Sequence, residues 1–553
     1  MTTPSPAAPP ARPVDPASAW APLAIPTFRT LWIVWVTANI CMGMNDVAAA
    51  WLMTSLTHSP VMVALVQSAA AAPVFLLGIP SGALADILDR RRYFMATQFW
   101  VAGVAVLLFA ASVTGALSPH LLLVLTFANG VGFAMRWPVF SAIMPELVPR
   151  PQMPAAQGLN GVAMNVSRIV GPMLAGAMLA AASGTFVYAV NAVASTAAGF
   201  AIMRWRRKPE VSKLPAERFL GAIRVGVQYI AQSPPLRVVM LRIFVFFTQS
   251  TALLALLPVV AKSYPGAGAG TYTVLLAAMG AGAIVAALSM TRLRRHMGSN
   301  AMVRYGTLLH AAMTVAVALA PDVWFALPAM FVAGMAWIVV ANAMLIVAQF
   351  GLPDWVRARG MAIMQTALMG GNAIGAAIWG QVASSFGLRI GLIAAAVAAA
   401  LSLLLVQRFK LQTAESEDLR PARVWKEPET AFAVDPHDGP VMVTIRYRID
   451  PARAAEFAQV MQESRRFRLQ HGALAWELLR DTAEPDTWIE YYVDESWAQH
   501  LRRFDRATAA DVALTERKYA FHLGPEKPAV ARYIAQSAGD AGTRAPTPPG
   551  ALV

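Results

Sequence analysis

The sequence predicts an all-α polytopic membrane protein with twelve transmembrane helices in two six-helix halves, followed by a small α+β cytoplasmic domain. Of its 553 residues, 57% are hydrophobic and only 14% are charged, whereas soluble globular proteins carry about 25% charged residues. Long apolar runs alternate with short charged clusters up to Arg408, and the pattern then changes. These observations argue against a soluble enzyme of this size and exclude disordered and collagen-like classes.

The N-terminal segment, residues 1–28, is rich in Pro and Ala and lacks the charged and short apolar regions of a signal peptide. We expect a disordered cytoplasmic tail there, without cleavage. Twelve runs of about 17 to 25 mainly apolar residues follow, each long enough to cross a bilayer as a helix. The N-terminal half, residues 29–204, contains the runs 31–54, 61–84, 94–114, 121–144, 160–182 and 186–203. The C-terminal half, residues 238–408, contains the runs 241–260, 272–290, 303–319, 323–349, 360–382 and 390–406.

The distribution of basic residues predicts the topology. Residues 1–408 contain 26 Lys and Arg against nine Asp and Glu, a net charge of +17, and the remainder contains 19 against 22, a net charge of −3. With both termini inside, cytoplasmic segments up to Arg408 hold 21 of those 26 basic residues, and external loops hold only Lys262 and Arg389. Because basic residues accumulate on the cytoplasmic side, we expect a multi-pass protein of the bacterial plasma membrane with both termini in the cytoplasm. The basic excess is explained by topology, so nucleic acid is not expected as a partner.

A linker, residues 205–237, separates the two halves. Its apolar residues Phe219, Ile223, Val227 and Ile230 recur at helical spacing. The linker is expected to contain an amphipathic helix that either lies on the inner membrane surface or packs on the cytoplasmic face of the protein.

An internal repeat supports the division into halves. The segment 82–91 matches 286–295 at an offset of 204 residues, and at the same offset Gly171 matches Gly375 and Gly176 matches Gly380. Small residues at these positions would let helices approach each other closely. Two matching halves are typical of transporters built from parallel repeats around a central substrate site.

The loop after the second run carries Gly82, Asp86, Arg90, Arg91 and Arg92. This pattern resembles the signature of the major facilitator superfamily. The segments 78–92 and 160–172 resemble the branch called transmembrane secretion effectors, related to enterobactin exporters, and the resemblance covers roughly residues 28–410. It implies the twelve-helix fold and export of a small molecule.

This loop pattern also suggests a gate. A carboxylate at a helix end can hold the positive N-terminal end of a neighbouring helix, while arginines bind lipid phosphates or loop carboxylates. By the family's architecture, the partner of Asp86 is the helix start near Gly360. The alternative is a charge cluster that only sets topology. The second half has Met290 in place of Asp86, so a latch there must be weaker or work differently.

The charged residues that lie deepest in the apolar runs are Asp46, Arg136 and Arg168. Charges at membrane depth are costly, so they are functional candidates. Asp46 could exchange protons during transport, or could instead form a structural ion pair with Arg136 or Arg168. Either arginine could also receive an anionic substrate group. Polar residues that either line the cavity or bond between helices are Asn39, Asn165 and Asn372.

No cofactor and no metal site is expected. Cys41 is the one cysteine and lies in the first apolar run, which rules out an intramolecular disulfide or a CxxC site. Nothing resembles a P-loop, so ATP-driven transport is disfavoured.

The last part of the chain changes in periodicity. A charged linker, residues 409–439, precedes a domain at 440–536, and residues 537–553 are expected to be a disordered tail. Strands are expected at 441–449, 473–480, 487–493 and 529–534, with one helix at 452–470 and another that begins at the N-cap residue Ser496. This β-α-β-β-α-β order is that of a ferredoxin-like domain.

The sequence of this domain around Trp476, Tyr491 and His500 resembles dimeric α+β barrel modules, which include antibiotic-biosynthesis monooxygenases. The resemblance implies a homodimer and a pocket for an aromatic compound lined by these three residues. The alternative is that His500 is a surface residue and that the fold serves binding or dimerisation only.

Taken together, these features predict a secondary transporter rather than an enzyme. We expect a proton-coupled exporter that moves a small amphipathic molecule, such as a siderophore, drug or secondary metabolite, through the bilayer by alternating access. The alternatives are a membrane-tethered sensor or enzyme that acts through the C-terminal domain, and an importer of the same fold.

Overall fold

The computed structural model describes residues 20–205, 219–266, 268–406, 422 and 428–536. The two expected tails, for the most part, and much of the linker 409–439 lie outside these residues. Contacts group the chain into two units. The first comprises Met1–Leu214, Ile243–Ala341 and Gln365–Leu405, and the second comprises Pro215–Arg242, Asn342–Met364 and Val406–Val553.

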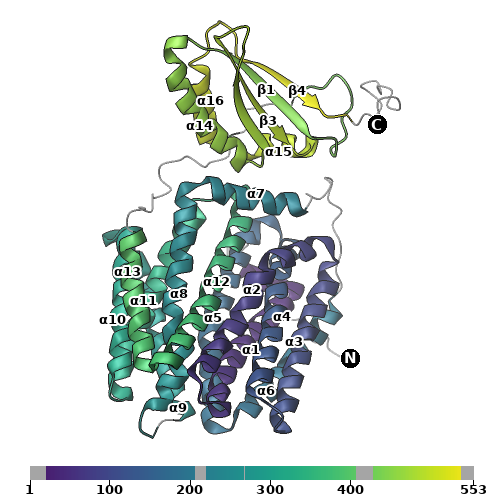
Figure 1. Ribbon diagram of the computed structural model, residues 1–553. Coiled ribbons are helices and arrows are strands. Elements are labelled where there is room, and N and C mark those ends of the chain that lie inside the picture. The colour runs from purple at the N-terminus through teal and green to yellow at the C-terminus, as the bar shows by residue number, and fades with distance from the viewer. Residues whose placement is uncertain (1–19, 206–218, 267, 407–421, 423–427, 537–553) are drawn as a thin grey trace, which may run out of the picture. The chain divides into compact units, whose positions relative to one another are not determined.

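Six long helices form the first half of the bundle (Figure 1). They are α1 (Pro26–Leu56), α2 (Pro60–Ile87), α3 (Arg90–Val113), α4 (Pro119–Leu147), α5 (Met153–Ala181) and α6 (Gly184–Arg204). Helix starts carry the expected chemistry: the side chains of Asp89, Ser118 and Ser183 cap α3, α4 and α6, and prolines occupy the first turn of α1, α2, α4 and α5.

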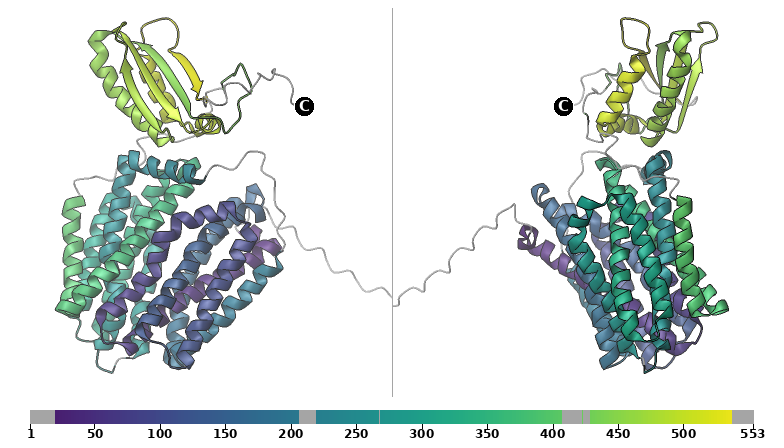
Figure 2. Two further views of the ribbon diagram at one scale, coloured as in Figure 1. Left: turned by 45° about the vertical axis from the view of Figure 1, so that its right-hand side comes forward. Right: turned by 90° about the vertical axis from the view of Figure 1, so that its left-hand side faces the viewer.

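Six further helices form the second half, and they run alongside one another in both views of Figure 2. They are α8 (Pro234–Ser263), α9 (Ala269–His296), α10 (Ser299–Leu319), α11 (Val323–Phe350), α12 (Asp354–Phe386) and α13 (Leu388–Val406). Each of the twelve predicted runs falls on one of these helices. Among the described residues, ten helices are long and apolar enough to span a membrane, while α5 and α13 have shorter apolar stretches, Val170–Ala181 and Leu388–Leu404.

The four glycines of the internal repeat mark equivalent close helix crossings, which confirms that prediction. A Cβ atom on Gly171 of α5 would lie 2.9 Å from the Ile40 carbonyl oxygen of α1, and one on Gly375 of α12 would lie 2.2 Å from the Thr248 carbonyl oxygen of α8. Likewise, Gly176 of α5 packs against Thr273 of α9, and Gly380 of α12 packs against Ala64 of α2. The two halves therefore repeat the same packing at these crossings, where the absence of a side chain lets the helices approach closely.

The C-terminal domain has the predicted β-α-β-β-α-β order. Its strands are β1 (Val441–Arg448), β2 (Ala475–Arg480), β3 (Thr487–Asp494) and β4 (Ala529–Ile534), which form an antiparallel sheet in the order β2-β3-β1-β4. Its helices are α14 (Ala454–Gln470), α15 (Trp497–Arg506) and α16 (Ala509–Tyr519). Helices α14 and α16 lie together on one face of the sheet (Figure 1).

The second helical segment of this domain is divided in two, which sequence reasoning missed. Ser496 caps α15 as predicted, since its Oγ accepts a hydrogen bond from the Gln499 N–H at 3.3 Å. Thr508 then starts a new helix with a capping box in which Asp511 Oδ2 accepts the Thr508 N–H at 2.6 Å. The Thr-x-x-Asp spacing was the available signal.

The linker between the halves contains the helix α7 (Phe219–Gln232). Its buried Tyr229 and Ile230 pack against Leu236 of α8 and against Leu352 and Val356 at the beginning of α12. This packing favours the alternative in which the helix packs on the protein.

Candidate functional site

Asp46 lies partly buried on α1. The phenol groups of Tyr188 on α6 and Tyr272 on α9 are within electrostatic range of its carboxylate. Tyr272 also stacks on Trp51 of α1, with ring centroids 5.8 Å apart. Among the residues that the structure describes, no hydrogen bond or ion pair engages the Asp46 side chain. Within the described part of the chain, the carboxylate therefore lies near two phenol groups and has no compensating cation, and the side chain of Arg168 lies outside that part.

The two halves of the bundle contact each other close to Asp46. The Lys262 ammonium of α8 donates a hydrogen bond to the Thr54 carbonyl oxygen of α1. The methyl group of Thr273 on α9 fills the space over Gly176 of α5. Asp46 consequently lies where helices of the first half meet helices of the second.

Asn372 is also placed beside a contact between the halves. Ser68 Oγ of α2 donates a hydrogen bond to the carbonyl oxygen of the adjacent Ala373 on α12, at 2.6 Å. Asn372 itself is partly buried. Asp46 and Asn372 thus both lie near surfaces that would change if the halves rocked against each other.

Arg136 of α4 is 1% exposed and does not pair with Asp46. Its guanidinium donates to Gln98 Oε1 at 3.2 Å and lies over the Trp35 ring, 5.4 Å from the centroid. Gln98 Nε2 in turn donates to the Ser195 carbonyl oxygen of α6 at 3.1 Å. The ion pair between Asp46 and Arg136 that the sequence allowed is absent from the described residues, and a neutral polar partner takes its place.

Gln98 was not singled out from the sequence, although a glutamine inside an apolar run is a detectable signal. Asn39, which was singled out, is 3% exposed and donates to the carbonyl oxygen of Trp35 within its own helix at 2.7 Å. The side chains of Asn165 and Arg168 on α5 lie outside the described residues.

The arginines of the loop motif tie helix ends together within the first half. Arg90 donates to Glu146 Oε1 at 2.7 Å and to the Ala142 carbonyl oxygen at 2.9 Å, both near the end of α4. Arg91 donates to the Met203 carbonyl oxygen at the end of α6, at 2.6 Å. Cations at these positions neutralise the negative ends of two helix dipoles.

The remaining motif residues are Arg92, whose backbone N–H donates to the capping Asp89 at 2.8 Å, and Gly82 and Asp86. Gly82 and Asp86 belong to the last turns of α2, and their surroundings lie outside the described residues.

In the C-terminal domain, Trp476 is directed at a fully buried carboxylate. Glu490 is 0% exposed, and its Oε1 accepts hydrogen bonds from Trp476 Nε1 at 3.1 Å and from Arg468 Nε at 3.1 Å. Lys518 Nζ lies 3.2 Å from Oε2. Burial alone would raise the pKa of Glu490, but Lys518 and Arg468 outweigh it and hold the pKa well below its usual value.

Glu490 has further donors beyond these three: Tyr447 at 3.0 Å and Ser464 at 2.7 Å. Burial lowers the pKa of Lys518 to about 8, against the opposing effect of Glu490. The carboxylate is thus satisfied by the protein itself, which makes this network a structural ionic core.

His500 is a buried residue rather than a surface residue. It is 0% exposed, its Nδ1 lies 3.0 Å from Asp494 Oδ2, and its Nε2 lies 3.1 Å from Arg532 Nε. Asp494 also pairs with Arg503. Burial alone would raise the pKa of Asp494, but Arg503 and the hydrogen bond from His500 lower it to about 2.

Tyr491 lies on the other face of the sheet. Alternation along β3 directs Glu490 and Tyr492 to the helix-covered face and Tyr491 away from it. The structure therefore places Trp476 in the Glu490 network and His500 in the Asp494 network, and leaves Tyr491 on the opposite face of the sheet.

A known protein family matches nearly the whole chain. A family model described as transmembrane secretion effector matches residues 17–539. The match continues through the C-terminal domain, beyond the region where the sequence motifs pointed to that family.

Two curated relatives are similar to the chain. Macrolide efflux protein A of Streptococcus pyogenes is 20% identical over 239 residues, which are 43% of this chain and 59% of the relative. The enterobactin exporter of Salmonella typhimurium is 23% identical over 361 residues, which are 64% of this chain and 85% of the relative. The chain thus spans about three fifths of the length of the macrolide efflux protein.

Among solved structures, the fold is similar to a bacterial homologue of the human lysosomal transporter Spinster in an inward-facing, occupied conformation. The TM-score is 0.57 at 16% sequence identity, over 69% of this chain and 96% of that chain. At this identity the likeness concerns the fold alone.

Proposed function

Because the chain belongs to the transmembrane secretion effector family of the major facilitator superfamily, and is thus a multi-pass membrane transporter, we propose that it exports a small amphipathic molecule by proton antiport. The substrate would be a siderophore, drug or secondary metabolite. Export is supported by relatives whose names are those of exporters of enterobactin and macrolides. The plasma membrane, with both termini in the cytoplasm, is the location that the distribution of basic residues supports.

The proposal of proton coupling rests on the surroundings of Asp46. Its carboxylate lies near two phenol groups with no cation engaging it among the described residues, and uncompensated carboxylates at membrane depth typically serve as proton relays in transporters. Movement of α9 relative to α1 would change its exposure. Proton release on one side and uptake on the other would couple the gradient to rocking of the halves.

The amphipathic substrate would bind between the halves, as in other transporters built from repeats. Gly82, Asp86 and the adjoining arginines would hold one gate closed. The contacts of Arg90 and Arg91 join the start of α3 to the ends of α4 and α6 within the first half, so these three helix ends would move together when the gate opens.

The experiment uses inverted membrane vesicles with an imposed pH gradient, to which siderophores, macrolides and lipophilic phenols are added in turn. We expect partial collapse of the gradient with one class of compound. Asp46→Asn should reduce this collapse at least tenfold while leaving substrate binding detectable. Glu429→Gln is the matched control, because it removes an exposed carboxylate outside the bundle. Collapse that persists in Asp46→Asn would contradict the role of Asp46.

We assign the C-terminal domain a structural role in dimerisation rather than catalysis. Its helix-covered interior is filled by the Glu490 and Asp494 networks, which does not favour a substrate pocket. The opposite sheet face exposes Met442, Leu479 and Tyr533. If this face joins two copies, Tyr533→Lys should shift the full-length protein in detergent from dimer to monomer in mass measurements. Gln462→Lys, on the exposed side of α14, should leave it dimeric.

A further inference from the structure

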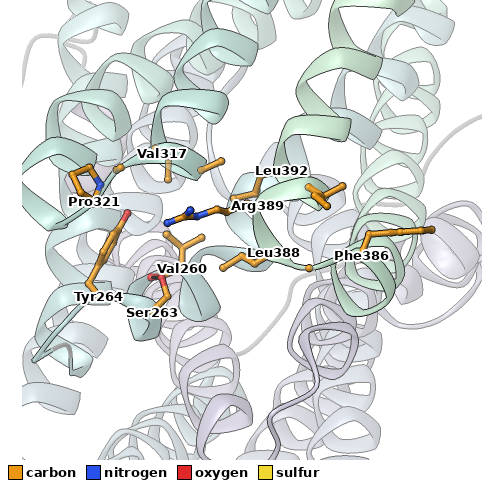
Figure 3. A pocket seen from close by; sticks show the side chains of 13 residues that line it. Val260, Ser263, Tyr264, Val317, Pro321, Phe386, Leu388, Arg389 and Leu392 are labelled. Carbon is orange, nitrogen blue, oxygen red and sulfur yellow. Dashed lines mark hydrogen bonds between the residues drawn. The ribbon is translucent and has the colours of Figure 1, made fainter.

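A pocket of about 520 Å³ lies at the end of the bundle where α8 and α10 end and α13 begins (Figure 3). Its wall is mostly apolar, formed by side chains that include Val260, Val317 and Leu392. All lining residues belong to one unit of the structure and are described. The lining residues all belong to the second half.

Two polar groups are directed into this pocket. Tyr264 is 8% exposed, and its buried Oη has no hydrogen-bond partner within the described chain. The guanidinium of Arg389 points across the pocket toward Tyr264 (Figure 3). No ion pair engages Arg389 in the described part of the chain. A buried hydroxyl without a partner is costly unless a ligand or water satisfies it.

The backbone adds to the positive character of the site. Gly387, Leu388 and Arg389 line the pocket at the start of α13, a helix of 19 residues. The first N–H groups of an α-helix have no partner within the helix and favour anions. The carboxylate of Asp322 lies within electrostatic range of Tyr264 and is partly engaged by the start of α11, since its Oδ1 accepts the N–H groups of Trp324 at 2.8 Å and Phe325 at 3.2 Å.

Large aromatic side chains are exposed at the same end of the bundle. Trp324 is 76% exposed, Phe325 is 64% exposed, and Phe386 at the rim of the pocket is 66% exposed. Exposed aromatic residues at helix ends mark the level of the lipid headgroups in membrane proteins. The pocket is therefore at the depth where an anionic headgroup and the beginning of an acyl chain would meet the protein.

We propose that this pocket binds an anionic amphiphile, with the acidic headgroup between Arg389, Tyr264 Oη and the start of α13, and the apolar chain along Val260, Val317 and Leu392. An acidic phospholipid and a long-chain carboxylate share this chemistry. Arg389 supplies the charge, and Tyr264 donates a hydrogen bond to the headgroup. The lining residues come from the second half alone, and the proposal does not depend on the proposed function.

Native mass spectrometry of the full-length protein in detergent tests the proposal, with dioleoyl phosphatidylglycerol, dioleoyl phosphatidylcholine, oleate and inorganic phosphate added separately. We expect one of the two anionic amphiphiles, phosphatidylglycerol or oleate, to bind at least fivefold more tightly than phosphatidylcholine. Arg389→Gln should reduce this binding about tenfold. Tyr264→Phe, which removes one hydroxyl, should reduce it about threefold. Arg295→Gln, an exposed arginine at the end of α9, is the matched control and should leave the tightest binding event unchanged.

Equal binding of phosphatidylglycerol by Arg389→Gln and Arg295→Gln would overturn the proposal. Competition by inorganic phosphate at the concentration of the lipid would also overturn it, because the apolar wall would then contribute nothing. Preference for phosphatidylglycerol over oleate would identify a phospholipid headgroup, and the reverse would identify a free carboxylate. If Arg389→Gln does not fold, Tyr264→Phe with unchanged binding gives the contrary result by itself.

Discussion

The guanidinium of Arg506, in the C-terminal domain, lies 4.7 Å from the ring centroid of Trp355, in the first turn of α12. The imidazole ring of His471 lies 5.3 Å from the same indole, and Tyr229 of α7 meets it edge-on at 5.6 Å. Trp355 is thus the point where α7, the beginning of α12 and the C-terminal domain pack together. Any movement of the start of α12 would therefore change the contacts of Trp355 with the C-terminal domain.

Polar contacts reinforce the same interface. Arg224 of α7 forms a 2.6 Å ion pair with Glu495, and Gln470 Nε2 donates to the Gln232 carbonyl oxygen at 3.3 Å. Gly472 allows α7 to come close, since a Cβ atom there would lie 2.6 Å from Val225. The domain is therefore attached to the linker helix over several turns.

Replacing Trp355 by Ala should loosen this attachment. The change removes a cation–π contact worth about 0.5–2 kcal/mol and the packing of two further rings. In hydrogen exchange of the full-length protein, we expect amide protection in α7 and in the first turn of α12 to fall about fivefold or more. Trp324→Ala, which removes an indole that is 76% exposed, should leave these amides unchanged. Unaltered protection in Trp355→Ala would mean that the ring cluster does not hold the interface.

Glu490→Gln should destabilise the C-terminal domain strongly. The amide cannot balance Lys518 and Arg468, which would be left as buried charges, and breaking a buried pair in this way costs about 3–5 kcal/mol. Chemical denaturation followed by hydrogen exchange in β1 and β3 would measure the loss. Glu477→Gln, on the exposed side of β2, is the matched control and should change stability by less than about 0.5 kcal/mol. A loss below about 1 kcal/mol in Glu490→Gln would show that the network relaxes around the amide.

The stability of the same domain should fall on acidification. Burial and the neighbouring Arg503 lower the pKa of His471 to about 3, whereas an unfolded histidine has a pKa of about 6.5. The unfolded chain therefore binds more protons between these values, so stability is full above about pH 6.5 and decreases toward pH 3. Asp494, with its pKa lowered to about 2, adds a further loss below about pH 4.

Hydrogen exchange of β1 and β3 between pH 7.5 and pH 4.5, corrected for intrinsic rates, would measure this dependence. His471→Gln should reduce the slope over that range, because one titrating group is removed, while the slope due to His500, whose pKa burial also lowers, remains. His437→Gln removes an exposed histidine and should keep the slope of the unaltered protein. An identical slope in His471→Gln would show that His471 does not dominate the acid response.

The helices, the repeat and the order of strands were predictable from local patterns. Apolar runs, periodicity and caps such as Ser496 are encoded over a few residues, and the 204-residue offset placed Gly171 and Gly375 at equivalent crossings. The ionic interior of the C-terminal domain was not predictable in this way. Glu490 and Lys518 are 28 residues apart, and only the sheet and α16 bring them together.

The same reason explains the candidate site in the membrane bundle. Asp46 and Arg136 were both recognised as costly charges, but whether they form a pair depends on the rotation of α1 and α4, which sequence spacing does not determine. The partner of Arg136 proved to be Gln98, on a third helix. Tyr264 and Arg389 were not connected either, because the pocket arises from three helix ends that are far apart in the chain.

Gly334→Ala should destabilise the second half of the bundle more than any propensity gain can offset. A Cβ atom on Gly334 of α11 would lie 1.9 Å from the Met279 carbonyl oxygen of α9, and one on Gly282 of α9 would lie 1.9 Å from the Phe331 carbonyl oxygen of α11. The two backbones thus touch through reciprocal glycines, and a methyl group there must push the helices apart. Overpacking of this kind costs about 1–3 kcal/mol, against a helix propensity gain of about 1 kcal/mol.

For Gly334→Ala we expect a lower Tm of the detergent-solubilised protein, together with reduced transport. Gly280→Ala on α9, where nothing lies within 4 Å of the added Cβ atom, is the matched control and should keep or slightly raise the Tm. If both substitutions give the same Tm, the crossing tolerates a side chain, and glycine is not required for the close approach of α9 and α11.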